Sequence, residues 1–76
     1  MVTDDCIEMI RRWYPFLKKQ ERAEFVNETA SYIQGLIDMA GLACIIRTDM
    51  EIELKDELKN IVSNRLTELE EVANSA

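Results

Sequence analysis

Histidine is absent from the 76-residue sequence, and cysteine and glycine occur only twice each. Without an imidazole, the chain lacks the commonest general base and the usual partner of a nucleophilic cysteine. Two cysteines and no histidine are also too few ligands for a zinc site. The glycine-rich motifs that bind phosphates and dinucleotides are missing as well. The sequence therefore predicts a protein that is not an enzyme and that uses no cofactor and no metal.

Long apolar runs are also missing from the chain. No uninterrupted apolar stretch approaches the ~18 residues that a membrane-spanning helix needs. The first residues, with Asp4 and Asp5, lack the basic start and the apolar core of a signal peptide. Both Cys6 and Cys44 fall at apolar positions, which favours buried reduced thiols over a disulfide. We therefore expect a cytoplasmic protein that does not contact a membrane.

Between positions 20 and 47, apolar residues recur at alternating steps of three and four, which is the period of a helix facing a partner helix. Two such rows lie side by side, one from Ala23 to Cys44 and the other from Phe25 to Ile46. Together they cover roughly 160° of the helix, which is wide enough for two neighbours. We expect one continuous helix over about residues 18–46. The alternative is that Gly41 ends the helix and that an extended segment follows it.

Signals at both ends of this stretch predict two further helices. The residue before a proline avoids the α region, so a first helix over about residues 3–14 should end just before Pro15. Thr48 and Glu51 have the spacing of a capping box, which marks the start of a last helix over about residues 49–73. The prediction is an all-α single domain, residues 1–76. In it, a short N-terminal helix packs on a long antiparallel helical hairpin.

The short length and the wide apolar face predict self-association. A domain of this size buries only about 60% of its unfolded surface, so it is marginally stable alone. Leu42, Ile45 and Ile46 make the end of the second helix apolar all round, and either a second subunit or the first helix must cover it. Arg65 lies inside the apolar stripe of the last helix, where it either meets a carboxylate across the bundle or fixes the register of a dimer. We expect a homodimer that completes the bundle through Ile37, Leu42, Ile45, Ile46 and Arg65.

Two charged regions are candidate contact surfaces in a chain of net charge −6. Residues 11–22 hold five basic residues and three aromatics, and they could fill the core's edge, anchor a protein interface or bind nucleic-acid phosphates. The net negative charge disfavours the nucleic-acid interpretation. The last helix carries an acidic face that is either solvated or imitates phosphates and occupies a basic site on another protein.

The predicted function is that of a small non-catalytic regulator or inhibitor that binds a protein of unknown identity through its helical surfaces. Small size, acidity and the lack of catalytic residues are typical of accessory proteins of phages, plasmids and bacteria. The alternatives are a nucleic-acid-associated accessory protein that uses residues 11–22, or a self-assembling structural subunit. The candidate partner-binding residues are Arg11, Arg12, Trp13, Tyr14, Phe16, Lys18, Lys19, Glu57, Glu68 and Glu71.

Overall fold

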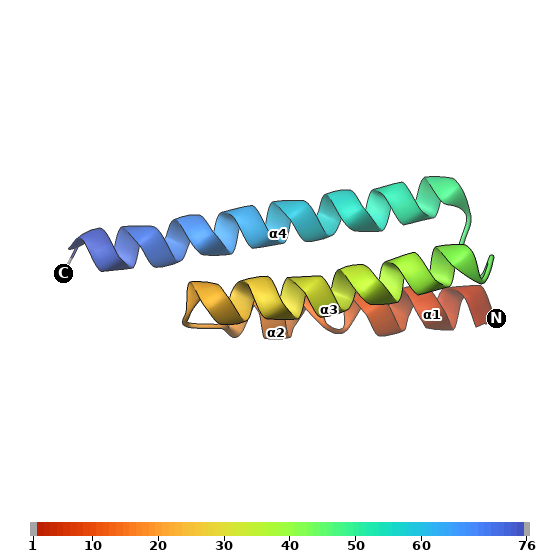
Figure 1. Cartoon of the computed structure of the whole chain (residues 1–76), viewed down its shortest axis with the longest axis horizontal. Helices are drawn as coiled ribbons and strands as arrows, with labels where there is room; N and C mark the ends of the chain where they lie inside the picture. The colour runs from red at the N-terminus through yellow and green to blue at the C-terminus, as the bar shows by residue number, and fades with distance from the viewer. Residues whose placement is uncertain (1, 76) are drawn as a thin grey trace.

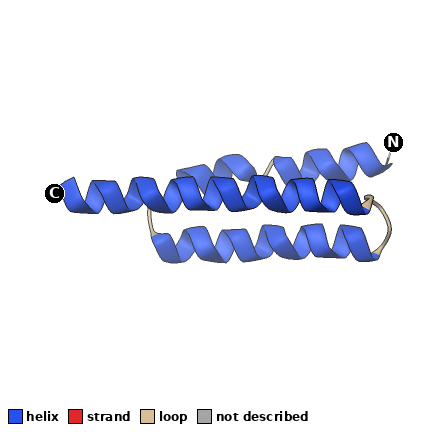
Figure 2. Ribbon diagram, turned by 90° about the horizontal axis from the view of Figure 1, so that it is seen from above, coloured by secondary structure: helices blue, strands red, loops and turns tan. Residues whose placement is uncertain are grey.

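The computed structural model of the protein describes residues 2–75 and contains four helices. These are α1 (Val2–Arg11), α2 (Tyr14–Lys19), α3 (Ala23–Leu42) and α4 (Thr48–Ser75). Helices α1 and α2 follow one another along the same side of α3, and α4 runs antiparallel to α3 (Figure 1). Viewed from above, the chain forms three rods: the α1–α2 rod, α3 and α4 (Figure 2). No strand occurs in residues 2–75, so the all-α prediction is confirmed.

The break between α1 and α2 lies next to the single proline, as predicted. Pro15 has no backbone N–H and cannot continue the hydrogen-bond ladder of α1. The chain nevertheless keeps its direction, because the Arg12 N–H donates to the Glu8 carbonyl at 3.0 Å and the Leu17 N–H donates to the Trp13 carbonyl at 3.3 Å. One face of α1 therefore continues into α2.

The expected helix over residues 18–46 is wrong at its N-terminal end, because the chain reverses direction between α2 and α3. Gln20 and Arg22 are both extended, with ψ near 132° and 136°. Arg65 of α4 donates from its Nε to the Gln20 carbonyl at 2.9 Å. A side chain distant in the sequence thus satisfies the C-terminal end of α2, which local sequence signals do not reveal.

The C-terminal end of this expected helix is also wrong, because α3 ends at Leu42. The Ile45 N–H donates to the Ala40 carbonyl at 3.0 Å and the Cys44 N–H donates to the Gly41 carbonyl at 3.1 Å. This is the Schellman pattern of a helix end. Its left-handed position is occupied by Cys44, with φ 57°, where glycine is the usual residue. Gly41 is therefore helical, and the chain turns three residues later than a stop at this glycine would require.

The next helix begins without the capping box that its sequence predicts. Thr48 is the first residue of α4, and the Met50 N–H donates at 3.0 Å to the Asp49 side chain. Glu51 instead lies 3.4 Å from the ammonium of Lys55, one turn later on the same helix. The start of α4 is therefore close to its predicted position, although the contacts that form it are different.

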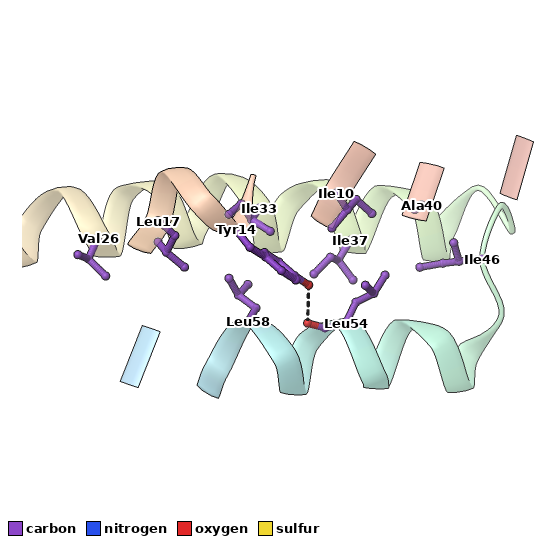
Figure 3. Packing of buried hydrophobic residues seen from close by; sticks show 10 residues of the cluster. All are labelled: Ile10, Tyr14, Leu17, Val26, Ile33, Ile37, Ala40, Ile46, Leu54 and Leu58. Carbon is purple, nitrogen blue, oxygen red and sulfur yellow. Dashed lines mark hydrogen bonds between the residues drawn. The ribbon is translucent and has the colours of Figure 1, made fainter. Parts of the chain in front are cut away.

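The core consists of one apolar row from each rod, and these rows point towards a common centre (Figure 3). The first row predicted for the second helix supplies the α3 part of the core. Fully burying one such side chain contributes about 1.5–3 kcal/mol. The second predicted row lies at the edge of this core along α3, and only its last residue, Ile46, which follows the helix, is buried. The buried residues are Ile10, Tyr14, Leu17, Val26, Ile33, Ile37, Ala40, Ile46, Leu54 and Leu58.

Gly35 lies in the middle of α3, and a Cβ added there would meet nothing within 4 Å. Gly35→Ala should therefore raise the free energy of unfolding by about 0.5–1 kcal/mol, because alanine restricts the unfolded chain. Gly41 is the comparison position, since a Cβ there would lie 2.6 Å from Glu51 Oε1 and the Glu51 side chain would have to move. Urea denaturation of both variants checks this. A loss of stability at Gly35 would contradict the open space described there.

Candidate protein-interaction surface

The three rods leave three outer grooves along the bundle, and ion pairs bridge two of them. Between α3 and α4, Lys55 Nζ lies 2.9 Å from Asp38 Oδ1. This hydrogen bond is the main cause of the lowered pKa of Asp38 and the raised pKa of Lys55. The hollow that surrounds this pair also contains the polar side chains of Asn27 and Gln34. Apolar side chains, among them Val62 and Leu66, line the same hollow, so the groove between α3 and α4 is of mixed character and is bridged by an ion pair.

The groove between the α1–α2 rod and α4 is bridged by a bidentate pair. Arg11 donates from Nε to Glu57 Oε1 at 3.1 Å and from Nη2 to Glu57 Oε2 at 2.8 Å. The hydrogen bond to Glu57 is the main cause of the raised pKa of Arg11. Glu53 lies 3.7 Å from the same guanidinium. Both partners are partly exposed, so this pair contributes little to stability but keeps the groove polar.

The third groove, between the α1–α2 rod and α3, carries the exposed apolar side chains. Trp13 of the rod and Tyr32 of α3 meet edge to face, with ring centroids 5.0 Å apart, and Phe16 lies 5.5 Å from Trp13. Phe16 and Tyr32 are nevertheless 58% and 54% exposed. Within residues 2–75 no ion pair crosses this groove. A hollow in it is lined by Trp13, Glu28, Thr29 and Tyr32.

Two rows of residues form the sides of this groove, each at alternating steps of four and three. Each row lies one position before the core row of its rod, so it sits at the edge of the core. The rod and α3 are antiparallel, so a row that precedes the core row by one residue turns towards the same outer groove on both. The Trp13–Tyr32 contact shows that the two rows face each other there. We call the surface made by the two rows the aromatic groove. Its rows are 2, 6, 9, 13 and 16 on the rod, and 25, 29, 32, 36 and 39 on α3.

The aromatic groove holds most of the exposed large hydrophobic residues of the described chain. Nine large hydrophobic residues are exposed, and six of them belong to its two rows. A contiguous apolar surface of this kind marks an interaction site more often than scattered residues do. The six are Val2, Met9, Phe16, Phe25, Tyr32 and Met39.

The structure divides the candidate residues of segment 11–22 among different environments. Tyr14 belongs to the core and is 8% exposed, so it is not available to a partner. Its hydroxyl lies 3.3 Å from the Leu54 carbonyl and 3.2 Å from Glu57 Oε1. Arg12 pairs with Glu8 at 2.9 Å, whereas Lys18 and Lys19 are exposed. Because Arg11 reaches α4 whereas Trp13 packs on Tyr32 of α3, the segment does not form one basic aromatic patch.

The candidate residues of the acidic face are also separated. Glu57 is held by Arg11 and by the Tyr14 hydroxyl. Glu68 is exposed and lies 3.4 Å from Arg65, and Glu71 is exposed. The carboxylates nearest the core thus serve contacts within the chain, and only the last two remain on an open surface.

The structure places most of the candidate self-association residues inside the chain. Ile37 and Ile46 are buried in the core, and Ile45 is half-buried, with its carbonyl accepting a hydrogen bond from Thr3 Oγ1 at 2.9 Å. The N-terminal helix of the same chain therefore covers the end of α3, which was the alternative to a second subunit. Leu42 alone is 81% exposed. Arg65 donates hydrogen bonds to Glu68 on its own helix and to the Gln20 carbonyl across the bundle. The partner across the bundle is therefore a backbone carbonyl and not the carboxylate that the sequence predicted.

Sequence reasoning did not identify five residues of the aromatic groove as contact residues: Val2, Met9, Phe25, Tyr32 and Met39. The signal was present on α3, where the wide apolar face made by both rows was predicted to self-associate, although the residues of its second row were not named as contact residues. On the rod, Pro15 hides the matching row by dividing it between two helices. The steps from Val2 to Cys6, Met9, Trp13 and Phe16 would have shown it.

Comparisons of this chain with protein families, curated proteins and solved structures give no match. Within residues 2–75, no three potential ligands are grouped so that they could hold a metal ion. No helix in the same range combines the length and the hydropathy needed to cross a bilayer.

Proposed function

We propose that this chain is a small non-catalytic regulator or inhibitor that binds protein through the aromatic groove. The observation that carries the proposal is that the exposed hydrophobic residues are concentrated in one of three grooves, whereas ion pairs bridge the other two. Trp, Tyr, Phe and Met are enriched at the centres of protein interfaces. Steps of three and four between apolar side chains are also the spacing by which one helix packs against another.

The nucleic-acid alternative has less support. Arg11 and Arg12 are engaged by carboxylates of the chain itself, and the net charge is −6. A single-strand site needs rings beside a continuous basic track. The rings of Trp13 and Tyr32 instead adjoin Glu28 in their hollow. The proposed compartment is the cytoplasm, which suits two cysteines that are free thiols in the structure.

A photo-crosslinking amino acid placed at Phe16 or Tyr32 tests the proposal in the native cells. We expect discrete protein adducts from both positions, because both side chains are exposed in the aromatic groove. Ile52 is the matched control, since it is 55% exposed but lies on α4. Equal adducts from Ile52, or adducts that disappear on nuclease treatment, would contradict the proposal.

A further inference from the structure

We infer that the protein bound in the aromatic groove is a second copy of this chain, related to the first by a two-fold axis. The inference rests on the proposed function and names the partner of that same site. In the pair, the α1–α2 rod and α3 of each copy form one layer, and the two layers pack face to face. The α4 helices then lie on the outside of the assembly.

The apolar rows suit this arrangement. Each layer consists of two antiparallel helices whose rows repeat at steps of four and three, which is the spacing of side chains that interlock between packed helices. A layer of this form can pack against an identical layer, because a two-fold contact uses the same patch on both copies. Phe16, Tyr32 and Met39 are each more than half exposed in the single chain, and they would become core residues of the pair.

The charges along the edges of the aromatic groove are complementary to themselves. By helical periodicity, the outer edge of the rod reads Asp5, Glu8, Arg12 and Lys19, so acids come first and bases follow. The outer edge of α3 carries Glu24 and Glu28 in its first half and Asp38 near its end, where Asp38 pairs with Lys55 of α4 at 2.9 Å. The edges therefore carry both positive and negative charges in a fixed order along the groove. Only a partner surface with the opposite order of charges is complementary to them.

Two orientations of a two-fold axis bring the aromatic grooves of two copies together, one along the bundle and one across it. Both place basic residues of one copy opposite acidic residues of the other. With the axis along the bundle, Lys19 meets the partner's Glu24 and the partner's Glu28. With the axis across the bundle, Lys19 and Arg12 meet the acidic first half of the partner's rod. In both cases acids of one copy also approach Asp38 of the other, whose charge is balanced by Lys55 of its own chain. Complementarity of this kind fixes partner choice and register.

The available area is sufficient for a stable dimer. A standard interface removes about 800 Å² from each partner. The solvent-accessible surface of the chain is 5459 Å². Because the bundle is elongated, most of this surface lies along its three outer grooves. One groove therefore supplies enough surface. Another apolar hollow lies where α4 extends past the start of α3, and Val72 is its one strongly exposed large hydrophobic residue.

Sedimentation equilibrium of the full chain, from low to high micromolar concentration, tests the inference. We expect a monomer–dimer equilibrium for the native sequence. Phe16→Glu and Tyr32→Glu should each raise the dimer dissociation constant at least about 10-fold, because each places a charge in the centre of the contact. Ile52→Glu on α4 is the control and should leave the constant unchanged, and circular dichroism should show equal helix content in all four proteins. Equal weakening by the control would overturn the inference.

Charge reversal gives an independent test. Lys19→Glu should weaken the dimer, more strongly at low salt than at high salt. Adding Glu24→Lys should restore it if the axis lies along the bundle, whereas adding Asp5→Lys should restore it if the axis lies across the bundle. Restoration by neither second change would overturn the assigned contact.

The result for the native chain also separates this inference from the proposed function. A protein that stays monomeric at high micromolar concentration, yet forms adducts with another protein from Phe16 and Tyr32, would overturn the second copy as partner and leave the proposed function standing. A monomer that forms no adducts from the groove would overturn both. A dimer with adducts to itself from the same positions would support the inference and the part of the proposed function that makes the aromatic groove a protein-binding surface.

Discussion

Ile37→Ala should lower the free energy of unfolding by about 2–5 kcal/mol. Ile37 is fully buried on α3 and lies between Ile10 of α1 and Leu54 of α4 (Figure 3). Its removal leaves a cavity that the rods on either side cannot close without losing their own contacts. A chain of 76 residues has a total stability of about 4–11 kcal/mol, so the variant should be close to unfolding at room temperature.

Urea denaturation followed by circular dichroism measures this loss. Leu42→Ala is the control on the same helix, because Leu42 is 81% exposed and its truncation should change the stability by less than about 0.5 kcal/mol. Similar losses at the two positions would show that the interior of the bundle is not where Figure 3 places it. The cost at Ile37 should also be independent of protein concentration, since its contacts lie within one chain.

The stability should fall steeply at alkaline pH because of Tyr14. Burial is the main cause that raises the pKa of its phenol above the usual value, and the adjacent Glu57 carboxylate raises it further. The unfolded chain loses the phenolic proton near its ordinary pKa of about 10, whereas the folded chain retains it. Stability from this group is therefore complete below about pH 10 and is lost as the pH rises above that value, by up to about 1.4 kcal/mol per unit.

Comparison with Tyr14→Phe isolates this effect from the titration of lysines. At neutral pH the variant should lose about 1 kcal/mol, because the hydroxyl no longer bonds to the Leu54 carbonyl and Glu57. Above about pH 10 its stability should decline less steeply than that of the native chain. Parallel declines of the two proteins between pH 9 and about 12 would contradict the assigned role of Tyr14.

Much of the fold follows from periodicity and from one proline. The steps of three and four placed Val26, Ile33 and Ile37 on a helix face that enters the core, and the structure confirms this. Pro15 marked the end of the first helix to within a few residues. These features are local, since a few neighbouring side chains determine them.

The errors fall where contacts between distant residues decide the backbone. Gln20, Glu21 and Arg22 contain no turn signal, and the reversal there is supported by Arg65 from the far end of α4. Cys44 adopts a left-handed conformation that sequence rules reserve for glycine, and the turn lets Ile46 enter the core. The exposure of the candidate self-association residues was misjudged for the same reason, since Ile37 and Ile46 lie in the core. A sequence shows which residues are apolar, but the packing of three rods decides which apolar row remains outside.

The order of the elements along the chain has a consequence for folding kinetics. Helices α3 and α4 are joined by a short turn, so their contacts form at a small cost in loop-closure entropy. The α1–α2 rod meets α4 across long separations, and the Tyr14 hydroxyl and the Leu54 carbonyl lie 40 residues apart. Local contacts form faster than distant ones. Because residues 20–22 join α2 to α3 by a similarly short turn, this order favours a pathway in which the two local pairings, α2 with α3 and α3 with α4, form first, and the contacts between the N-terminal rod and α4 form last.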